Sequence, residues 1–378
     1  MTDDPLIARE FPQSPELVYL NHAAVAPWPA RAARAVQEFA DENVTLGATR
    51  YETWLARERH LRDQLRRLVN APSTDDIALL KNTSEAVSIV ACGMDWRWGD
   101  NVVSTDEEFP SNRIPWDAQR KWGVSLREIP VRGVDAEAAL ISACDERTRV
   151  LTVSSVQYGS GLRLDLGRLG AFCRAHGILF CVDAIQSLGA VRMDVQEIGA
   201  DFVMADAHKW MLGPEGIAVF YCRADVRATL ELRQYGWHMT QSAGDFDTKA
   251  WRPAATAQRF ECGTLNQLGI AALSASLSLL EEYGLARVEQ RLAGICAYLW
   301  DALKANPRLD MITPADPLRR AGIITFRVPG DDPLRLQRKL VEKQVICACR
   351  AGGVRLSPHF YLSRQRLDRA LELINTTI

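Results

Sequence analysis

The stretch that decides the fold reads Ile178-Leu-Phe-Cys-Val-Asp183 and continues as Ala184-Ile185-Gln186. A second apolar segment, Phe202-Val-Met-Ala205, leads directly into Asp206-Ala-His-Lys-Trp210. Short apolar runs of this kind are typical of strands that are buried on both faces of a parallel sheet. Ligands bind at the carboxyl ends of such strands, so an aspartate and a lysine that follow two successive strands are expected to face one site.

This pair, Asp183 and Lys209, has the chemistry that pyridoxal 5'-phosphate (PLP) requires. A lysine amine can hold the aldehyde of PLP covalently. A carboxylate can keep the pyridine nitrogen protonated, so that the ring accepts electrons from a substrate carbanion. Taken singly, an aspartate at a strand end is as often a turn or cap residue as a functional one, and a single lysine usually lies on the surface. Their joint position favours a catalytic role.

Apolar runs alternate with helical patterns up to about residue 267. The predicted strands are Ile77–Leu80, Asn101–Thr105, Arg149–Ser154, Ile178–Asp183, Phe202–Ala205 and Gly216–Cys222. The predicted helices are Tyr51–Val69, Ser84–Met94, Ser111–Trp122, Ala136–Cys144 and Leu166–His176. This alternation predicts an α/β fold with a mostly parallel, doubly wound sheet.

The pattern changes in the last third of the chain. Two long helical stretches, Gly269–Tyr283 and Leu285–Ala305, precede a predicted strand at Gly322–Val328. A helix (Pro333–Lys343), a strand (Val345–Arg350) and a last helix (Ser363–Ile374) are predicted to follow. We therefore predict a large PLP-binding domain over residues 18–267. A smaller α+β domain is expected to combine residues 1–17 with residues 268–378.

Composition excludes several classes of protein. The formal net charge of -2 is unlike that of an electrostatic nucleic-acid binder, which carries a basic surplus. No apolar run reaches the roughly 20 residues that a membrane span needs. The segment Met1–Leu6 lacks the apolar centre of a signal peptide. The nine scattered cysteines are typical of reduced thiols, so a cytoplasmic protein without a metal site is expected.

Three further positions could complete a site, although each has an ordinary structural reading. Asn82-Thr-Ser-Glu85 begins a predicted helix, where hydroxyls and free N–H groups can bind phosphate or simply cap the helix. Phe109 follows a strand and could stack on a flat ring or pack in a loop. Arg355 could bind a substrate carboxylate through two parallel hydrogen bonds, but arginines are abundant here.

Together these segments resemble the class V aminotransferases of the fold type I PLP superfamily. That group includes cysteine desulfurases, selenocysteine lyases, kynureninases and isopenicillin N epimerase-like enzymes. The matching stretches run in order along nearly the whole chain: Tyr19-Leu-Asn-His-Ala-Ala24, Asn82-Thr-Ser-Glu-Ala86, Glu108-Phe-Pro-Ser-Asn112, Val182-Asp-Ala-Ile-Gln186, His208-Lys-Trp210, Gly213-Pro-Glu-Gly216, Phe260-Glu-Cys-Gly-Thr-Leu-Asn266 and Arg355-Leu-Ser-Pro-His-Phe-Tyr361.

The resemblance implies a role for each candidate. Lys209 would bind the PLP aldehyde and move the proton at the substrate α-carbon, and Asp183 would pair with the ring nitrogen. Gln186 would approach the phenolic oxygen, and Phe109 would stack on the ring. Arg355 would bind the substrate carboxylate.

The remaining implied roles concern the phosphate, the partner subunit and the pocket wall. Thr264 would reach the phosphate bound to a partner subunit, which implies a homodimer. The other candidates are Thr83, Ser84 and His208 for the phosphate, and His22 for the substrate pocket.

Three departures from the family pattern bear on the reaction. Only Ala351-Gly-Gly-Val354 separates Arg350 from Arg355, which leaves no room for the long loop that carries the nucleophilic cysteine of desulfurases. Asp206 stands where many relatives have a phosphate-binding serine. By the same resemblance, Ser155-Val-Gln157 stands where relatives have an asparagine after the strand Arg149–Ser154.

We therefore rank transamination first, a C–S or C–Se lyase that needs no cysteine loop second, and epimerisation third. A non-catalytic PLP-fold protein is disfavoured, because such a protein would be expected to have lost Lys209, Asp183 or Arg355. A regulator with an N-terminal helix-turn-helix is not expected either, since the enzyme pattern begins by about residue 18.

Overall fold

The computed structural model describes residues 4–378, and its centre is a mixed sheet of seven strands. The spatial order is β2-β8-β7-β6-β5-β3-β4. Strand β8 runs antiparallel to β2 and β7, and the other neighbouring pairs are parallel. The strands are β2 (Ile77–Leu80), β3 (Asn101–Thr105), β4 (Ser125–Ile129), β5 (Thr148–Ser154), β6 (Leu179–Asp183), β7 (Phe202–Asp206) and β8 (Ala218–Cys222). The predicted α/β class with a mostly parallel sheet is confirmed.

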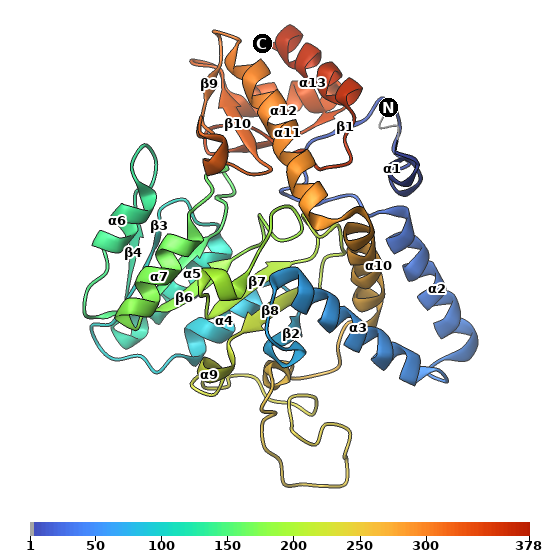
Figure 1. Ribbon diagram of the computed structural model, residues 1–378, viewed down its shortest axis with the longest axis vertical. Helices are drawn as coiled ribbons and strands as arrows, with labels where there is room; N and C mark the ends of the chain where they lie inside the picture. The colour runs from blue at the N-terminus through green and yellow to red at the C-terminus, as the bar shows by residue number, and fades with distance from the viewer. Residues whose placement is uncertain (1–3) are drawn as a thin grey trace.

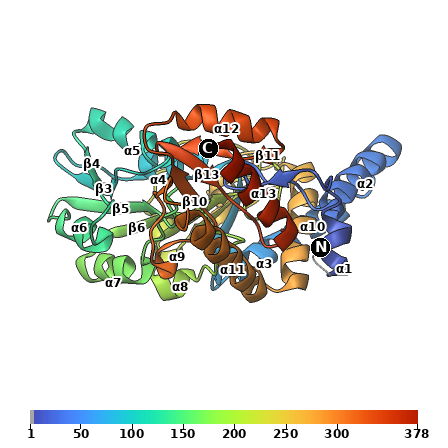
Figure 2. The same cartoon turned by 90° about the horizontal axis from the view of Figure 1, so that it is seen from above.

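The sheet is buried on both faces because alternate residues of each strand enter two different cores. Phe180 and Val182 pack into the larger core, whereas Cys181 between them belongs to the smaller one. The larger core includes side chains from α3 (Tyr51–Val69), α6 (Ala136–Ser142) and α7 (Leu166–His176), and the smaller core includes α4 (Thr83–Gly93) and α5 (Ile114–Asp117). Figures 1 and 2 show helices on both sides of the sheet.

The last part of the chain forms a second group of elements around an antiparallel sheet, drawn in orange and red at the top of Figure 1. Its strands lie in the order β12-β13-β10-β9. The strands are β9 (Asp310–Met311), β10 (Ile324–Arg327), β12 (Ala348–Arg350) and β13 (Gly353–Leu356), and the helices are α11 (Leu285–Lys304), α12 (Pro333–Glu342) and α13 (Arg364–Thr377).

Two contacts connect the N-terminal part of the chain to elements that are distant in the sequence. Strand β1 (Val18–Tyr19) pairs in parallel with β11 (Val345–Ile346), which brings the N-terminal segment beside the C-terminal elements. Helix α10 (Gln267–Tyr283) packs against α2 (Ala30–Leu46) and α3, and it lies alongside α2 in Figure 1. The short helix α1 (Pro5–Glu10) lies close to these elements. The exact limits of the two domains stay a prediction.

Some predicted elements differ from those observed. The predicted helix Ser111–Trp122 is three short pieces, η2 (Pro110–Asn112), α5 and η3 (Ala118–Trp122). The predicted strand Val345–Arg350 is divided into β11 and β12. The remaining short helices are η1 (Thr74–Asp76), α8 (Val195–Ile198), α9 (Ala224–Arg227), η4 (Ala257–Phe260) and η5 (Pro317–Arg319).

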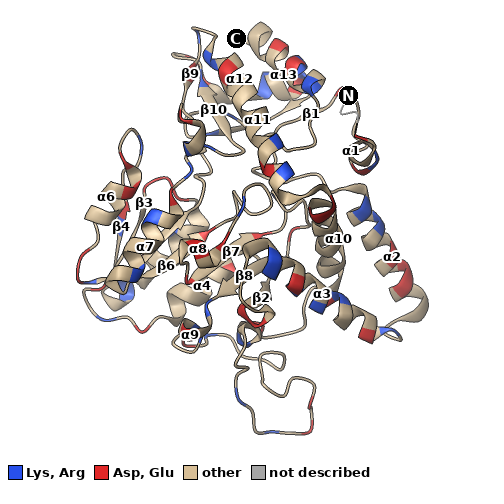
Figure 3. Ribbon diagram, viewed as in Figure 1, with Lys and Arg blue, Asp and Glu red and all other residues tan. Residues whose placement is uncertain are grey.

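Basic and acidic residues are interspersed along the elements visible in Figure 3, and their numbers nearly balance over the chain. Within residues 4–378, we find no helix with the length and apolar character needed to cross a membrane.

Candidate active site

A cavity of about 240 Å³ opens where the carboxyl ends of β6 and β7 meet the start of α4 and the hairpin β12–β13. Its lining brings together residues that are far apart in the sequence. Seven predicted site residues line it: Thr83, Phe109, Asp183, Gln186, His208, Lys209 and Arg355. Tyr158, Ser111 and Arg350 also line it, although the sequence did not single them out as site residues.

Asp183 is a buried carboxylate with one oxygen left free. It is 1% exposed, and its Oδ1 accepts a hydrogen bond of 3.0 Å from the backbone N–H of Ile185. Its Oδ2 is buried and has no hydrogen-bond partner among the described residues. Burial raises the pKa of Asp183, and the nearby Glu108 adds to this rise. An unpaired buried oxygen in a cavity wall is expected to receive a donor from whatever the cavity binds.

The carboxylate of Glu108 is arranged differently, because its oxygens already have donors from several directions. They accept hydrogen bonds from Thr105 Oγ1 (2.9 Å), Ser154 N (2.8 Å), Ser154 Oγ (2.6 Å), Gln157 Nε2 (2.9 Å) and Asn112 Nδ2 (2.9 Å). Gln157 is therefore turned toward Glu108. Glu108 supports the strand ends that carry the site and is not itself in the cavity lining.

Lys209 lies in the same lining with its ammonium largely removed from solvent. Burial lowers the pKa of Lys209, whereas Asp183 acts in the opposite direction and Arg355 lowers it further. The Nζ atom is 5.6 Å from the ring centroid of Phe109. Phe109 is 39% exposed and meets Tyr158 edge to face at 5.2 Å. A lowered pKa makes the neutral, nucleophilic amine of Lys209 more available.

The side-chain amide of Gln186 is held from both ends. Its Oε1 accepts a hydrogen bond of 3.0 Å from Trp210 Nε1, and its Nε2 donates to the carbonyl of Ala23 at 3.0 Å. One N–H of this amide is left over for a ligand. Trp210, the residue after Lys209, therefore fixes the orientation of Gln186.

The start of α4 forms another side of the cavity. The N–H of Thr83 donates to Asp206 Oδ2 at 3.2 Å, and the N–H of Asp206 donates to Thr83 Oγ1 at 3.0 Å. Ser84 is exposed and is hydrogen-bonded to Ser111 at 2.7 Å. Burial lowers the pKa of His208 to about 4, so this ring is neutral at physiological pH.

Two arginines reach the cavity from one hairpin. Arg350 pairs with Gly353 across the turn, so Ala351 and Gly352 alone form its tip, with φ angles of 50° and 75°. Arg355 is 1% exposed; its Nη1 donates to the Tyr158 carbonyl at 2.8 Å, and its Nη2 donates to Asn21 Oδ1 at 3.4 Å. Arg350 is exposed. The hairpin confirms that no cysteine-bearing loop separates the two arginines.

Three predicted residues lie outside this lining. Ser84 lies next to it through Ser111. Thr264 is exposed and lines a separate hollow with Lys81 and Glu85. His22 is fully buried, with its Nδ1 at 2.8 Å from the Ser357 carbonyl and its Nε2 at 2.7 Å from the Tyr361 hydroxyl. With both ring nitrogens occupied, this geometry gives no support to a substrate contact by His22.

All nine cysteines are free, and none of them lines the cavity among residues 4–378. One cluster elsewhere, Glu58, His238 and Glu261, has the side chains of a metal site. However, the guanidinium of Arg62 already donates to both carboxylates, at 2.7 Å to Glu58 and 2.6 Å to Glu261. A cation therefore already occupies this position.

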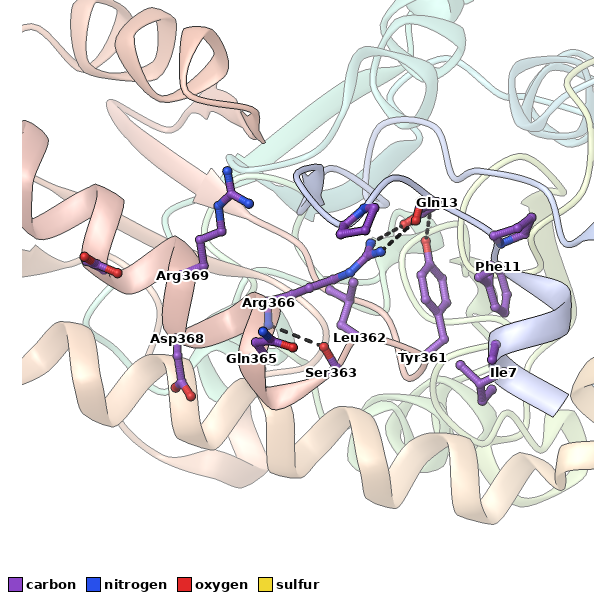
Figure 4. Close-up of a pocket in the computed structure, with 14 residues that line it drawn as sticks. Ile7, Phe11, Gln13, Tyr361, Leu362, Ser363, Gln365, Arg366, Asp368 and Arg369 are labelled. Carbon is purple, nitrogen blue, oxygen red and sulfur yellow. Dashed lines mark hydrogen bonds between the residues drawn. The ribbon is translucent and has the colours of Figure 1, made fainter. Parts of the chain in front are cut away.

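A larger cavity of about 840 Å³ lies between α1 and α13. Figure 4 shows Arg366 reaching toward Gln13, and Gln13 reaching toward Tyr361. Both Nη atoms of Arg366 also bind backbone carbonyls, at 3.2 Å for Leu17 and 3.1 Å for Ser14. None of the described residues that line this cavity is a lysine or a buried carboxylate with an unpaired oxygen, so the smaller cavity is the better catalytic candidate.

Comparison with known proteins identifies the family of this chain. Residues 18–363 match the protein family described as aminotransferase class-V. The chain belongs to this family. It is 32% identical to a probable cysteine desulfurase of Methanothermobacter thermautotrophicus, over 96% of this chain and 95% of the relative.

Solved structures with lower identity share the fold. The apo structure of a cysteine desulfurase from Thermococcus onnurineus NA1 superposes with a TM-score of 0.86 at 24% identity, covering 98% of this chain and 96% of that one. The cystine C–S lyase C-DES, in complex with its reaction product cysteine persulfide, gives a TM-score of 0.89 at 23% identity, covering 97% and 99%.

Class V enzymes use PLP, and the cavity has suitable partners for each part of that molecule. The free Oδ2 of Asp183 suits a protonated ring nitrogen, and Lys209 suits the aldehyde. The exposed ring of Phe109 can stack on a flat face. The N-terminus of α4, with the hydroxyls of Ser84 and Ser111 beside it, suits a phosphate. This chain is thus a PLP-dependent enzyme of class V.

Proposed function

We propose that this enzyme is a lyase that cleaves the C–S bond of cysteine or a cysteine derivative without a protein thiol to take up the sulfur. The observation that carries the proposal is the two-residue turn between β12 and β13, together with a cavity that has no cysteine in its described lining. The relative from Methanothermobacter thermautotrophicus is named a probable cysteine desulfurase, which supports a sulfur-containing substrate. The sequence alone ranks transamination first, and the names of the relatives move C–S cleavage ahead of it.

The proposed binding step uses the two charged ends of the cavity. Arg355 would bind the substrate carboxylate through its guanidinium, whose Nε is buried and without a partner among the described residues. Asp183 would hold the proton on the cofactor's ring nitrogen. Gln186, oriented by Trp210, would donate its remaining N–H to the phenolic oxygen.

The proposed chemical step depends on proton transfer at the substrate α-carbon. PLP supplies a ring that accepts the electron pair left when the α-proton is removed. Lys209 would take that proton with the amine that the substrate has released. Loss of the sulfur from the β-carbon and addition of water then give pyruvate and ammonia, with sulfide from cysteine or a persulfide from cystine.

Two further properties belong to the same proposal. A homodimer is supported by the exposed Thr264 and by the long loop before it, drawn at the bottom of Figure 1. Four aromatic residues of that loop are 41% to 79% exposed: Tyr235, Trp237, Phe246 and Trp251. Such a group suits a second copy of the chain. A cytoplasmic location is supported by the nine unpaired thiols.

The test is product analysis with the purified protein and a panel that includes cysteine, cystine and alanine. The proposal expects pyruvate, ammonia and reduced or persulfide sulfur, while the cofactor stays PLP. Conversion to pyridoxamine phosphate would establish transamination instead, and a change of stereochemistry alone would establish epimerisation. Lys209→Ala is the control that should lose turnover.

A further inference from the structure

The phosphate side of the cavity contains a carboxylate where an anion has to bind. Asp206 ends β7 and lines the cavity with Thr83, Ser111 and His208. We propose that Asp206 is protonated when the phosphate of PLP is bound, and that its O–H donates a hydrogen bond to that phosphate. This inference rests on PLP as the cofactor and is independent of the reaction that follows.

The contacts of Asp206 show why a proton is needed. Its Oδ2 accepts the backbone N–H of Thr83, a donor at the start of α4 that would otherwise be free for an anion. Its Oδ1 is buried and has no hydrogen-bond partner in the described part of the chain. An ionised carboxylate with an unpaired buried oxygen is costly. A protonated one turns the same oxygen into a donor.

The charges around Asp206 act in both directions, because Lys209 favours the ionised carboxylate and nearby acids favour the neutral form. Glu215 and Asp183 both oppose a second negative charge near Asp206. His208, with Nδ1 at 4.0 Å from Oδ2, is neutral, and the remaining nearby cation is Lys209, whose amine is needed for the aldehyde.

The pKa of Asp206 is already raised in the protein without a bound phosphate. Burial raises the pKa of Asp206 to about 6. A phosphate beside it carries roughly 1.5 to 2 negative charges at pH 7 and raises that pKa further.

Infrared spectra of the loaded enzyme test the proton directly. At about pH 7.5, the wild type is expected to show the C=O stretch of a neutral carboxyl group that Asp206→Asn lacks. Asp201→Asn is the matched control, because Asp201 is a buried aspartate that precedes the same strand at its other end. Its loss should leave the band in place. A wild-type band that survives unchanged in Asp206→Asn, or its absence from the wild type, would overturn the proposal.

A second measurement uses ligand binding by the cofactor-free full chain. The probes are 4-deoxypyridoxine phosphate, which has no aldehyde for Lys209, and unphosphorylated 4-deoxypyridoxine. The preference is the Kd of the unphosphorylated probe divided by the Kd of the phosphorylated probe. Between about pH 7 and pH 8, this ratio should fall close to tenfold in the wild type, because the phosphorylated probe binds only when Asp206 carries a proton. The preference of Asp206→Asn should stay flat. A flat preference in the wild type would refute the proposal, whereas failure to bind either probe in the wild type would refute the cofactor assignment.

Discussion

Arg355→Gln tests whether a buried arginine binds the substrate carboxylate, as distinct from an exposed arginine at the edge of the same cavity. Arg355 and Arg350 belong to one hairpin and line one cavity, but Arg355 is 1% exposed whereas Arg350 is exposed. The Arg355 guanidinium is fixed by Tyr158 and Asn21 before any substrate arrives. Its charge is therefore preorganised for a carboxylate.

The expected magnitude follows from this difference in burial. Truncating one partner of a buried, hydrogen-bonded charge pair costs about 2–5 kcal/mol. A loss of about 3 kcal/mol corresponds to roughly 150-fold in kcat/KM. An exposed ion pair contributes about 1 kcal/mol or less, so Arg350→Gln should lower kcat/KM by no more than about fivefold.

The assay is steady-state turnover of an α-amino acid substrate, with Arg350→Gln as the matched control on the same hairpin. Both variants should retain PLP, which visible absorbance reports. The reasoning would be refuted if Arg355→Gln lost less than about fivefold in kcat/KM, or if the exposed Arg350 proved to be the more costly loss.

Three other substitutions test the scaffold around the site. Gly189 has a φ of 97°, and a Cβ there would lie 2.5 Å from the Trp210 carbonyl oxygen. In a denaturant titration, Gly189→Ala should therefore lower the free energy of unfolding by more than Gly133→Ala, because a Cβ at Gly133 would enter open space. An equal loss in the two variants would contradict this. His22→Phe removes one hydrogen bond to the Ser357 carbonyl and one to the Tyr361 hydroxyl, although these groups keep the backbone N–H of residue 22 and Gln13 Nε2 as partners. At about 0.5–1.5 kcal/mol for each bond, we expect about 1–3 kcal/mol of lost stability with little change in KM; a large rise in KM would restore the substrate role. Burial raises the pKa of Asp183, so in the cofactor-free protein its ionisation costs stability as pH increases. Asp183→Asn should therefore gain melting temperature relative to the wild type as the pH rises from about 4 to about 7, the pKa to which burial raises this carboxyl group. A relative loss over that range would show that Lys209 outweighs the effect of burial.

The central strands were predictable because burial on both faces requires continuous apolar sequence. Strands β2 and β3 match their predicted limits for this reason. Strand β4 was missed because it lies at the sheet edge and its residues are exposed or half-buried. Helix α2 was missed because its apolar face is weak: Ala32, Val36 and Phe39 lie on one side at helical spacing, but of these only Ala32 is buried.

The site was predictable where it depends on strand ends, and less so where it depends on tertiary packing. Asp183 and Lys209 follow adjacent parallel strands, and the fold brings them into one cavity. Tyr158 and Arg350 enter the same cavity from a loop and a distant hairpin, so local sequence gave no sign of them. The two partners that occupy the ring of His22 come from residues more than 300 positions away. Only the folded chain reveals such contacts.

Borohydride reduction of the purified enzyme, followed by peptide mass mapping, tests the central claim most directly. The account predicts a pyridoxyl phosphate adduct on Lys209, and loss of that adduct in Lys209→Ala. An adduct on another lysine, or none on a well-folded protein supplied with PLP, would contradict it.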